Sequence, residues 1–170
     1  MGGGGSGSTG GSAGSAGGSS SSSQKQIPNC KRAMVWNKIK RKCVAQQQGE
    51  LDDNSIFETG RDLALAGRYD EAITILTLAA DKTDARILNM LGYSHRREGR
   101  VNVGIGYYHE AILNDPNYTP VREYLGEALL QIGDLAAAKA QLAEIEKRCG
   151  TTCSDYTDLL AQIRAYQGGI

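Results

Sequence analysis

Four cysteines are the residues of this chain whose spacing points most directly to covalent chemistry. They fall into two local pairs, Cys30 with Cys43 and Cys149 with Cys153. Neither pair is accompanied by histidine at the spacing of zinc ligands, so a metal site is not expected. Two even pairs favour two disulfides, which form in oxidising compartments. The alternative is four buried or free thiols in a reducing compartment.

Catalytic chemistry finds little support in the other reactive residues. His95 and His109 are the only histidines, and packing is the role expected of both. No serine lies in a nucleophile elbow, and a cysteine nucleophile would need a histidine beside it. The Gly104-Ile105-Gly106 stretch lacks the third glycine and the preceding strand of a dinucleotide-binding fingerprint. We therefore expect a protein that is not an enzyme and that holds no cofactor.

Charge is unevenly distributed along the chain, although the net charge is zero. Residues 1–49 contain seven basic side chains and no acidic one, whereas the remaining residues carry 12 basic and 19 acidic side chains. The basic segment either solvates itself and leans weakly on the acidic body, or it meets an anionic nucleic acid, glycan or lipid headgroup. Trp36 lies within this segment and is either its small core or a ring that stacks on a sugar or base. An anionic envelope component is therefore a possible partner.

The first 23 residues contain ten glycines and nine serines, a composition that predicts a flexible coil. An exported protein begins with a charged stretch, an apolar run and a cleavage site, and none is visible here. Either the signal peptide is missing from this sequence, or the Gly/Ser run replaces it, or the cysteines mislead. The run is a cloning linker or a natural spacer. No segment is apolar enough to predict a membrane span.

Glycines recur in one frame along the rest of the chain. Gly60, Gly92 and Gly126 are spaced by 32 and 34 residues, and each is followed seven residues later by another glycine. A period near 34 residues predicts an array of two-helix units, each of which buries its apolar side against the next. The expected fold is all-α, and the expected activity is to hold another molecule.

Hydrophobic spacing and helix-stop signals predict where the units begin and end. Three repeats are expected over about 53–84, 85–118 and 119–148, followed by a capping helix near 154–166. Helices should end at Gly67 and Gly99, and the second helix should include Ala79 and Ala80. Gly104 and Gly106 inside a helix predict a close helix–helix approach opposite Tyr107 or Tyr108. The predicted organisation is a disordered linker over 1–28, a basic disulfide-tied hairpin or loop with its connector over 29–52, and a helical domain over 53–167.

Several motifs together resemble the tetratricopeptide repeat (TPR) family over roughly residues 53–148. They are Leu91-Gly92-Tyr93, Leu125-Gly126, the run from Gly67 to Ile73, Tyr108, Ala111 and Asp115-Pro116. The resemblance implies an α-solenoid of three helix-turn-helix repeats plus a C-terminal capping helix. The wider layout, with a tied segment before the repeats and a cysteine-stapled cap after them, resembles small exported TPR proteins of Gram-negative bacteria. That resemblance implies a periplasmic or secreted protein.

In TPR proteins the first helix of each repeat lines a concave groove that binds a partner. Carried onto this chain, the groove residues are Asn54, Phe57, Arg61, Leu65, Arg86, Asn89, Tyr93, Arg96, Arg97, Glu123, Tyr124, Glu127, Leu130 and Gln131. Arg96 and Arg97 beside Tyr93 suit an extended peptide or protein tail with an acidic or C-terminal carboxylate. The alternative is that both arginines solvate a helix end.

Some TPR domains hold the acidic C-termini of chaperones in a clamp of lysines and asparagines. The matching positions here are Phe57, Arg61, Met90, Pro120 and Tyr124, and only Arg61 could substitute for a clamp residue. A chaperone adaptor is therefore not favoured.

Overall fold

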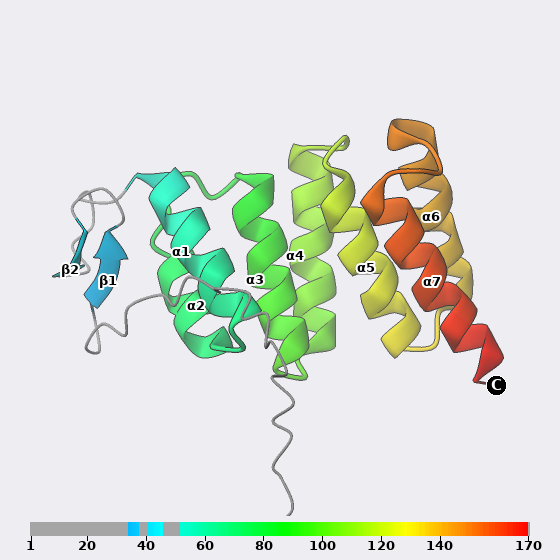
Figure 1. The fold of residues 1–170 in the computed structure, drawn as a ribbon, viewed down its shortest axis with the longest axis horizontal. Helices are drawn as coiled ribbons and strands as arrows, with labels where there is room; N and C mark the ends of the chain where they lie inside the picture. Colours follow the sequence, from blue (N-terminus) through cyan, green and yellow to red (C-terminus); the bar gives the residue numbers. More distant parts are fainter. Residues whose placement is uncertain (1–33, 38–40, 46–51, 170) are drawn as a thin grey trace, which may run out of the picture.

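A computed structural model describes residues 34–37, 41–45 and 52–169 (Figure 1). The helices in this part are α1 (Asp53–Leu65), α2 (Tyr69–Leu76), α3 (Ala85–Arg97), α4 (Val101–Asn114), α5 (Thr119–Gln131), α6 (Leu135–Cys149) and α7 (Ser154–Gly168). They confirm the predicted all-α architecture of three hairpins and a final helix. The predicted boundaries between the linker, the basic segment and the helical domain stay predictions.

Two short strands precede the helices. β1 (Met34–Asn37) and β2 (Lys42–Ala45) pair antiparallel, with Val35 opposite Val44 and Trp36 opposite Cys43. The basic segment thus contains a hairpin. The predicted partner of Cys43, Cys30, lies outside the described residues.

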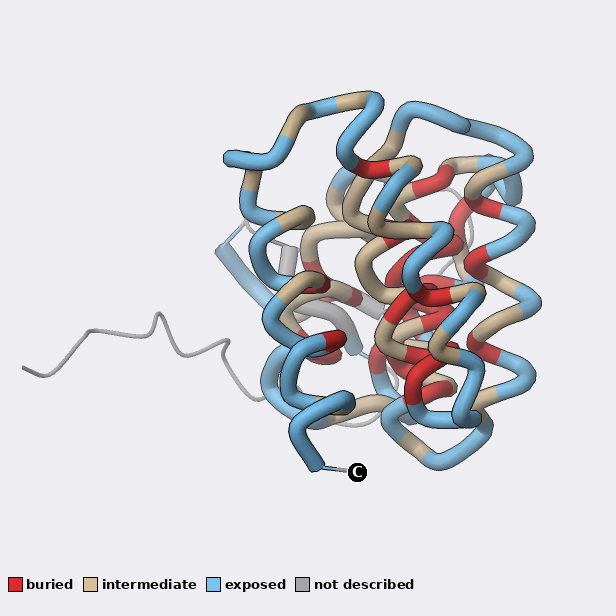
Figure 2. Tube along the Cα trace, turned by 90° about the vertical axis from the view of Figure 1, so that its right-hand side faces the viewer, coloured by how far each residue is buried: buried red, intermediate tan, exposed pale blue. Residues whose placement is uncertain are grey.

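The helices form two layers that run side by side along the molecule (Figure 1). Helices α1, α3, α5 and α7 contact one another in sequence and form the first layer, while α2, α4 and α6 cover one side of it. Figure 2 shows the buried stretches on the sides of helices that face one another and the exposed stretches along the outside. Tyr108, Leu125, Ile145 and Leu159 are among the fully buried side chains between the layers.

Glycine ends the first helix of each repeat in the same way. Gly67, Gly99 and Gly133 have φ values of 78°, 84° and 83°, a left-handed conformation that glycine adopts without strain. In each case the backbone N–H of the residue after the glycine donates to the carbonyl oxygen of the residue five positions earlier, with N···O distances of 2.8–3.0 Å. This is the Schellman arrangement, and it satisfies carbonyls that the helix end would otherwise leave unpaired. The predicted helix ends at Gly67 and Gly99 are confirmed.

The second helix of the first repeat is shorter than predicted. It ends at Leu76, so the expectation that Ala79 and Ala80 are helical was wrong. Both oxygens of Asp53 accept hydrogen bonds from backbone N–H groups after the helix, those of Ala80 at 2.7 Å and Asp81 at 2.8 Å. Ala79 is buried in this turn. The carboxylate at the start of α1 therefore supplies the acceptors that another turn of α2 would have provided.

The close approach predicted at Gly104 exists, but its partner is the backbone of α3. A Cβ on Gly104 would lie 2.7 Å from the carbonyl oxygen of Gly92, and a Cβ on Gly92 would lie 2.5 Å from Cε1 of Tyr108. The reason predicted for Gly106 was wrong, because no atom beyond the adjoining backbone of its own helix lies within 4 Å of the Cβ position there. Helices α3 and α4 thus meet at two glycines, and Gly106 is simply an exposed glycine on the outer side.

The two glycines of α4 give a matched test of this contact. We expect Gly104→Ala to lower the free energy of unfolding by about 1–3 kcal/mol, because the methyl group overpacks the contact with α3. Gly106→Ala should raise it by about 0.5–1 kcal/mol, because alanine favours the helix and meets open space. Urea denaturation of both variants measures the difference. Equal effects of the two substitutions would contradict the described contact.

Candidate functional site

The first layer of helices presents a continuous polar and aromatic surface, which we call the first-helix face. It carries Phe57, Arg61, Arg86, Tyr93, Arg97, Glu123, Tyr124, Glu127, Asp155 and Asp158. A pocket of about 400 Å³ hollows it between α3, α5 and α7, lined by Arg96, Arg97, Glu127, Leu130, Gln131, Gln162, Ala165 and Tyr166. Most of these side chains come from the helices that the sequence assigned to a groove.

Arginine side chains lie over aromatic rings at the α1–α3 end of this face. The guanidinium carbon of Arg86 is 4.8 Å from the centre of the Phe57 ring, and that of Arg61 is 5.6 Å from it. Arg86 donates to Oδ1 of Asn54 at 3.2 Å, which joins α3 to α1. Asp84 and Asp62 pair with these arginines at 2.7 and 2.8 Å, so each keeps only part of its charge available. Contacts of this kind hold a guanidinium in a fixed orientation.

Arg97 lies at the centre of the face between two tyrosine rings. Its guanidinium carbon is 5.8 Å from the ring centres of both Tyr69 and Tyr93, and its Nε donates to the Tyr69 hydroxyl at 3.2 Å. Tyr93 in turn packs on Tyr124, with ring centres 5.3 Å apart. The Arg97 side chain is exposed, and no acidic side chain pairs with it in the part of the chain described. It is therefore an oriented cation that faces solvent.

Arg96 plays a different part from its neighbour. The residue is only 5% exposed; its Nη2 pairs with Oε2 of Glu127 at 2.6 Å, and its Nε donates to the Tyr108 hydroxyl at 3.3 Å. One side chain of α3 is thereby tied to α4 and α5 at once. Removing it would leave a carboxylate without its partner, and such losses from buried pairs cost about 3–5 kcal/mol. Arg96 supports the face from beneath rather than offering a free contact.

Acidic side chains gather at the opposite, α5–α7 end of the face. Glu123 is half-buried and has no hydrogen bond or ion pair within residues 52–169. Burial, followed by the charges of Glu127, Asp155 and Asp158, raises the pKa of Glu123 from 4.5 to about 8. The face is thus divided into a basic half over α1 and α3 and an acidic half over α5 and α7.

Asn89 of α3 is a buried amide beside Tyr118. It is 1% exposed, and neither its Oδ1 nor its Nδ2 has a hydrogen-bond partner among the described residues. The amide approaches the Tyr118 hydroxyl without reaching ordinary hydrogen-bond geometry. Buried amide groups are nearly always paired, because an unpaired one costs about 1–3 kcal/mol. An unpaired amide at this place is therefore unusual.

The structure brings most of the predicted groove residues together and separates a few. Asn54, Phe57, Arg61 and Arg86 lie at one end, Tyr93, Arg97 and Tyr124 at the centre, and Glu123 and Glu127 at the other end. Leu130 and Gln131 line the pocket. Arg96 and Asn89 are buried, while Leu65 is exposed. Whether these residues bind a partner stays a prediction.

Sequence reasoning missed the contributions of two other helices. Tyr69 comes from the start of α2, and Asp155, Asp158 and Gln162 come from α7, which was predicted only as a cap. The last three are spaced at i, i+3 and i+7, and residues at that spacing share one side of a helix. This spacing was the available signal that α7 continues the first-helix face.

The remaining sequence predictions concern metals, histidines and membrane spans. No group of His, Cys, Asp or Glu that could hold a metal occurs among the residues described. His95 stacks on Tyr107 with ring centres 5.3 Å apart, and burial, then Arg100, lowers the His95 pKa. Within the described ranges, none of the helices has the length and apolar character needed to cross a bilayer.

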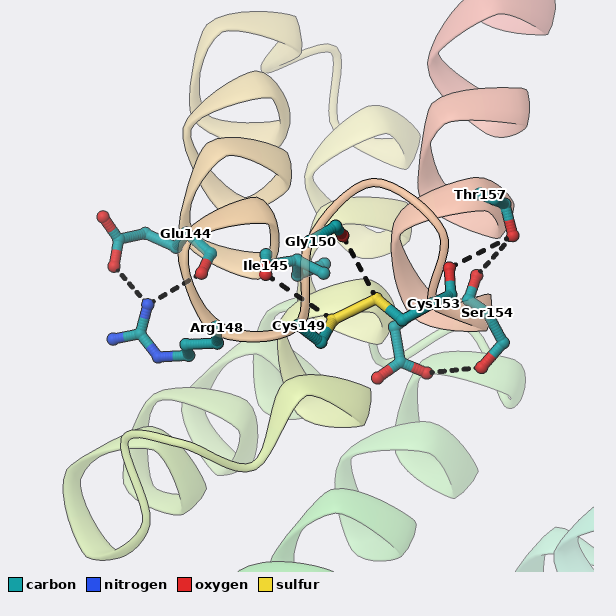
Figure 3. The surroundings of a disulfide bond; sticks show 9 residues. Glu144, Ile145, Arg148, Cys149, Gly150, Cys153, Ser154 and Thr157 are labelled. Atoms are coloured by element: carbon teal, nitrogen blue, oxygen red, sulfur yellow. Dashed lines mark hydrogen bonds and ion pairs between the residues drawn. A yellow bond between two sulfur atoms is a disulfide. The ribbon is translucent and has the colours of Figure 1, made fainter.

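A disulfide joins the last hairpin to the final helix, as predicted (Figure 3). It links Cys149, the last residue of α6, to Cys153, the residue before α7, with Cα atoms 6.0 Å apart. Beside it, Nη1 of Arg148 pairs with Glu144 at 2.6 Å. The disulfide therefore fixes the turn from which α7 starts. The side chain of Trp36 lies outside the described residues, and nothing in the described part supports an anionic envelope partner for its loop.

Comparisons with known proteins define the class of the fold. No protein-family model and no curated protein matches this sequence. Among solved structures, the chain is similar to the Yersinia enterocolitica type III secretion chaperone SycD in complex with a peptide of the translocator YopD, at 19% identity over 68% of this chain and 89% of that chain, with a TM-score of 0.56. It is similar to the first TPR domain of human RPAP3, at 20% identity over 69% of this chain and 93% of that chain, with a TM-score of 0.61.

A third similar structure is PcrH in complex with the chaperone-binding region of PopB, at 24% identity over 71% of this chain and 99% of that chain, with a TM-score of 0.58. With the repeated hairpins described above, these similarities show that the chain has the TPR-type helical-repeat fold.

The pKa of Glu123 makes stability depend on pH in a defined direction. A carboxyl whose pKa is higher in the folded state stabilises the fold at low pH, and that stability is lost between about pH 4.5 and pH 8. We expect Glu123→Gln to remove this loss of stability. At pH 8.5 the free energy of unfolding of the variant should exceed that of the wild type by about 1–2 kcal/mol, a figure discounted for solvent screening.

Urea denaturation at pH 5.5 and pH 8.5 measures this effect, with Glu146→Gln on the exposed side of α6 as the matched control. A Glu123→Gln variant whose advantage does not grow with pH would show that the carboxyl is not perturbed.

Proposed function

We propose that this protein is a non-enzymatic protein–protein interaction scaffold that binds an extended peptide or a protein tail across its first-helix face. The observation that carries the proposal is Arg97, an exposed guanidinium that two tyrosines hold in place and that no acidic side chain neutralises among the described residues. Such a group is prepared to bind an anion before the anion arrives. Little side-chain entropy is then lost on binding.

The chemistry of Arg97 indicates the chemistry of its ligand. A guanidinium binds carboxylates through parallel N–H···O bonds, and here the Tyr69 hydroxyl occupies only Nε. Acidic side chains and a C-terminal carboxylate both provide this group. The neighbouring rings of Tyr93 and Tyr124 add apolar surface on which a peptide backbone can lie.

The similar structures support the proposal, because several of them hold peptides on the same fold. SycD is in complex with a peptide of YopD, PcrH with the chaperone-binding region of PopB, and the first TPR of Spaghetti with the HSP90 peptide SRMEEVD. The clamp positions Phe57, Met90, Pro120 and Tyr124 differ from lysine and asparagine here. We therefore propose a peptide ligand that is not a chaperone C-terminus.

A charge reversal at Arg97 tests the proposal. Peptides of 12 random residues are selected by display on the wild-type protein, and the affinities of the enriched sequences are measured by fluorescence anisotropy. Arg97→Glu should weaken them at least tenfold, which is about 1.4 kcal/mol of binding free energy. Arg96 is left unchanged because it is buried and holds three helices together.

Lys139→Glu is the matched control, because it makes the same charge change on the exposed surface of α6. It should leave the affinities unchanged. If Arg97→Glu binds the selected peptides as well as the control does, or if no peptide is enriched, the first-helix face is not the binding site.

We also propose that the protein works in an oxidising compartment, the periplasm or outside the cell. The support is the disulfide between Cys149 and Cys153, since such bonds persist outside reducing compartments. Trypsin cleavage after Arg148 and Arg164 releases both cysteines in one peptide. In protein alkylated at the moment of cell lysis, we expect this peptide to carry no alkyl group until it is reduced. Alkylation of both cysteines without reductant would rule out the proposal.

A further inference from the structure

We propose that the α5–α7 end of the first-helix face is a subsite for an organic cation, namely a lysine or arginine side chain of the bound segment. The carboxyl groups of Glu123, Asp155 and Asp158 lie close enough to feel one another's charges, and the buried amide of Asn89 lies beside Tyr118, which is itself close to Asp155. The inference rests on the proposed peptide-binding function: Arg97 would bind a carboxylate of the peptide, and the α5–α7 end would bind its cation.

The acidic end of the face lacks a cation of its own. Glu123 and Asp158 form no ion pair within the described residues, and the side chain of Asp155 accepts only a bond of 3.3 Å from the Ser154 hydroxyl there. Two arginines of α3 come near this end, but Nη2 of Arg96 is already paired with Glu127, and Arg86, which lies near Tyr118, is paired with Asp84. Three neighbouring carboxyl groups, two of them partly buried and that of Asp158 exposed, therefore have no ion-pair partner in the described part of the protein.

Asn89 provides an independent observation at the same place. The amide is 99% buried, and both of its polar atoms are unpaired in the described chain. It approaches the hydroxyl of Tyr118, and Tyr118 in turn lies close enough to Asp155 and Arg86 to feel their charges. Asn89 occupies the same position in the second repeat as Glu123 in the third, and the helices that carry them, α3 and α5, are in contact. A ligand N–H group would satisfy Oδ1 of Asn89, which no described residue does in the free protein.

The electrostatics agree with this geometry. Glu123 is faced by Glu127 and Tyr124 of α5, by Asp155 and Asp158 of α7, and by Arg96 of α3. Burial and the surrounding carboxylates raise the pKa of Glu123 to about 8, so the free protein holds a proton there at neutral pH. A bound cation favours the ionised carboxylate, and binding below pH 8 must therefore release that proton. Affinity for the cation should rise with pH.

The two ends of the face together fix the orientation of the bound segment. Its carboxylate lies over Arg97 on α3, and its cation lies between α5 and α7. Packed helices are about 8–10 Å apart, and an extended chain advances about 3.3 Å per residue. The acidic and basic residues of the ligand should therefore be about three to six residues apart.

Small probes test the subsite without any knowledge of the natural partner. N-acetyl-arginine amide carries the cation, and N-acetyl-citrulline amide is its uncharged analogue of the same shape. Each is titrated into the ¹⁵N-labelled full chain, and the side-chain amide signals of Asn89 are followed by NMR. We expect the arginine probe to shift these signals, to bind at least tenfold more tightly than the citrulline probe, and to bind about tenfold more tightly at pH 8.5 than at pH 6.5.

Glu123→Gln should weaken the binding of the arginine probe at least fivefold and abolish the pH dependence of that binding. Glu146→Gln on α6 should change neither. Unchanged dispersion of the backbone signals shows that each variant is folded. Equal binding of the two probes, or full binding to Glu123→Gln, would falsify the cation subsite.

The display-selected peptides separate this inference from the proposed function. If Arg97→Glu abolishes their binding while Glu123→Gln leaves it intact, the peptide-binding function stands and the cation subsite is wrong. If the arginine probe binds as expected but no peptide depends on Arg97, the subsite stands and the peptide-binding function is wrong. If both variants weaken peptides that carry a basic residue three to six positions from an acidic one, both are supported.

Discussion

The buried guanidinium of Arg96 is the constraint on which the rest of this structure depends. It pairs with Glu127 of α5 and donates to the Tyr108 hydroxyl of α4, so one side chain sets the relative positions of three helices. Its neighbour Arg97 is exposed and lies between the rings of Tyr69 and Tyr93. The same pair neutralises Glu127, whereas Glu123, Asp155 and Asp158 have no basic partner among the described residues. A structural ion pair thus determines which charges the surface displays.

Backbone contact makes this arrangement possible. Tyr108 reaches Arg96 because its ring lies against Gly92, where any side chain would displace it, and α4 approaches α3 through Gly104. Glycine at these two positions lowers the helix propensity but allows the two helices to pack closely. The hydrogen bond from the Arg96 guanidinium offsets the cost of burying the Tyr108 hydroxyl.

The repeat frame was readable from the sequence because glycine has a local conformational reason to recur, and the turns at Gly67 and Gly99 follow from it. The end of α2 was not readable, since the acceptors that replace it belong to Asp53, 27 residues earlier than Ala80. Adjacent arginines gave no sign of which one faces inward, because the partner of Arg96 is 31 residues away. Asp155 and Asp158 were overlooked because a helix that covers the end of an array was not considered part of its working surface.

Helix α7 follows the last hairpin and also contributes Asp155 and Asp158 to the first-helix face, so under the proposed function the number of repeats sets the distance between the two ends of the site. Insertion of one more hairpin between α4 and α5 would replace the contacts that α5 now makes with α3 and α4, the Arg96–Glu127 pair among them, and would move the two ends of the first-helix face apart by one interhelical spacing. A segment that fits the present protein would then be too short by about three residues. On the proposed mode of binding, a change in repeat number therefore requires a change in the length of the ligand.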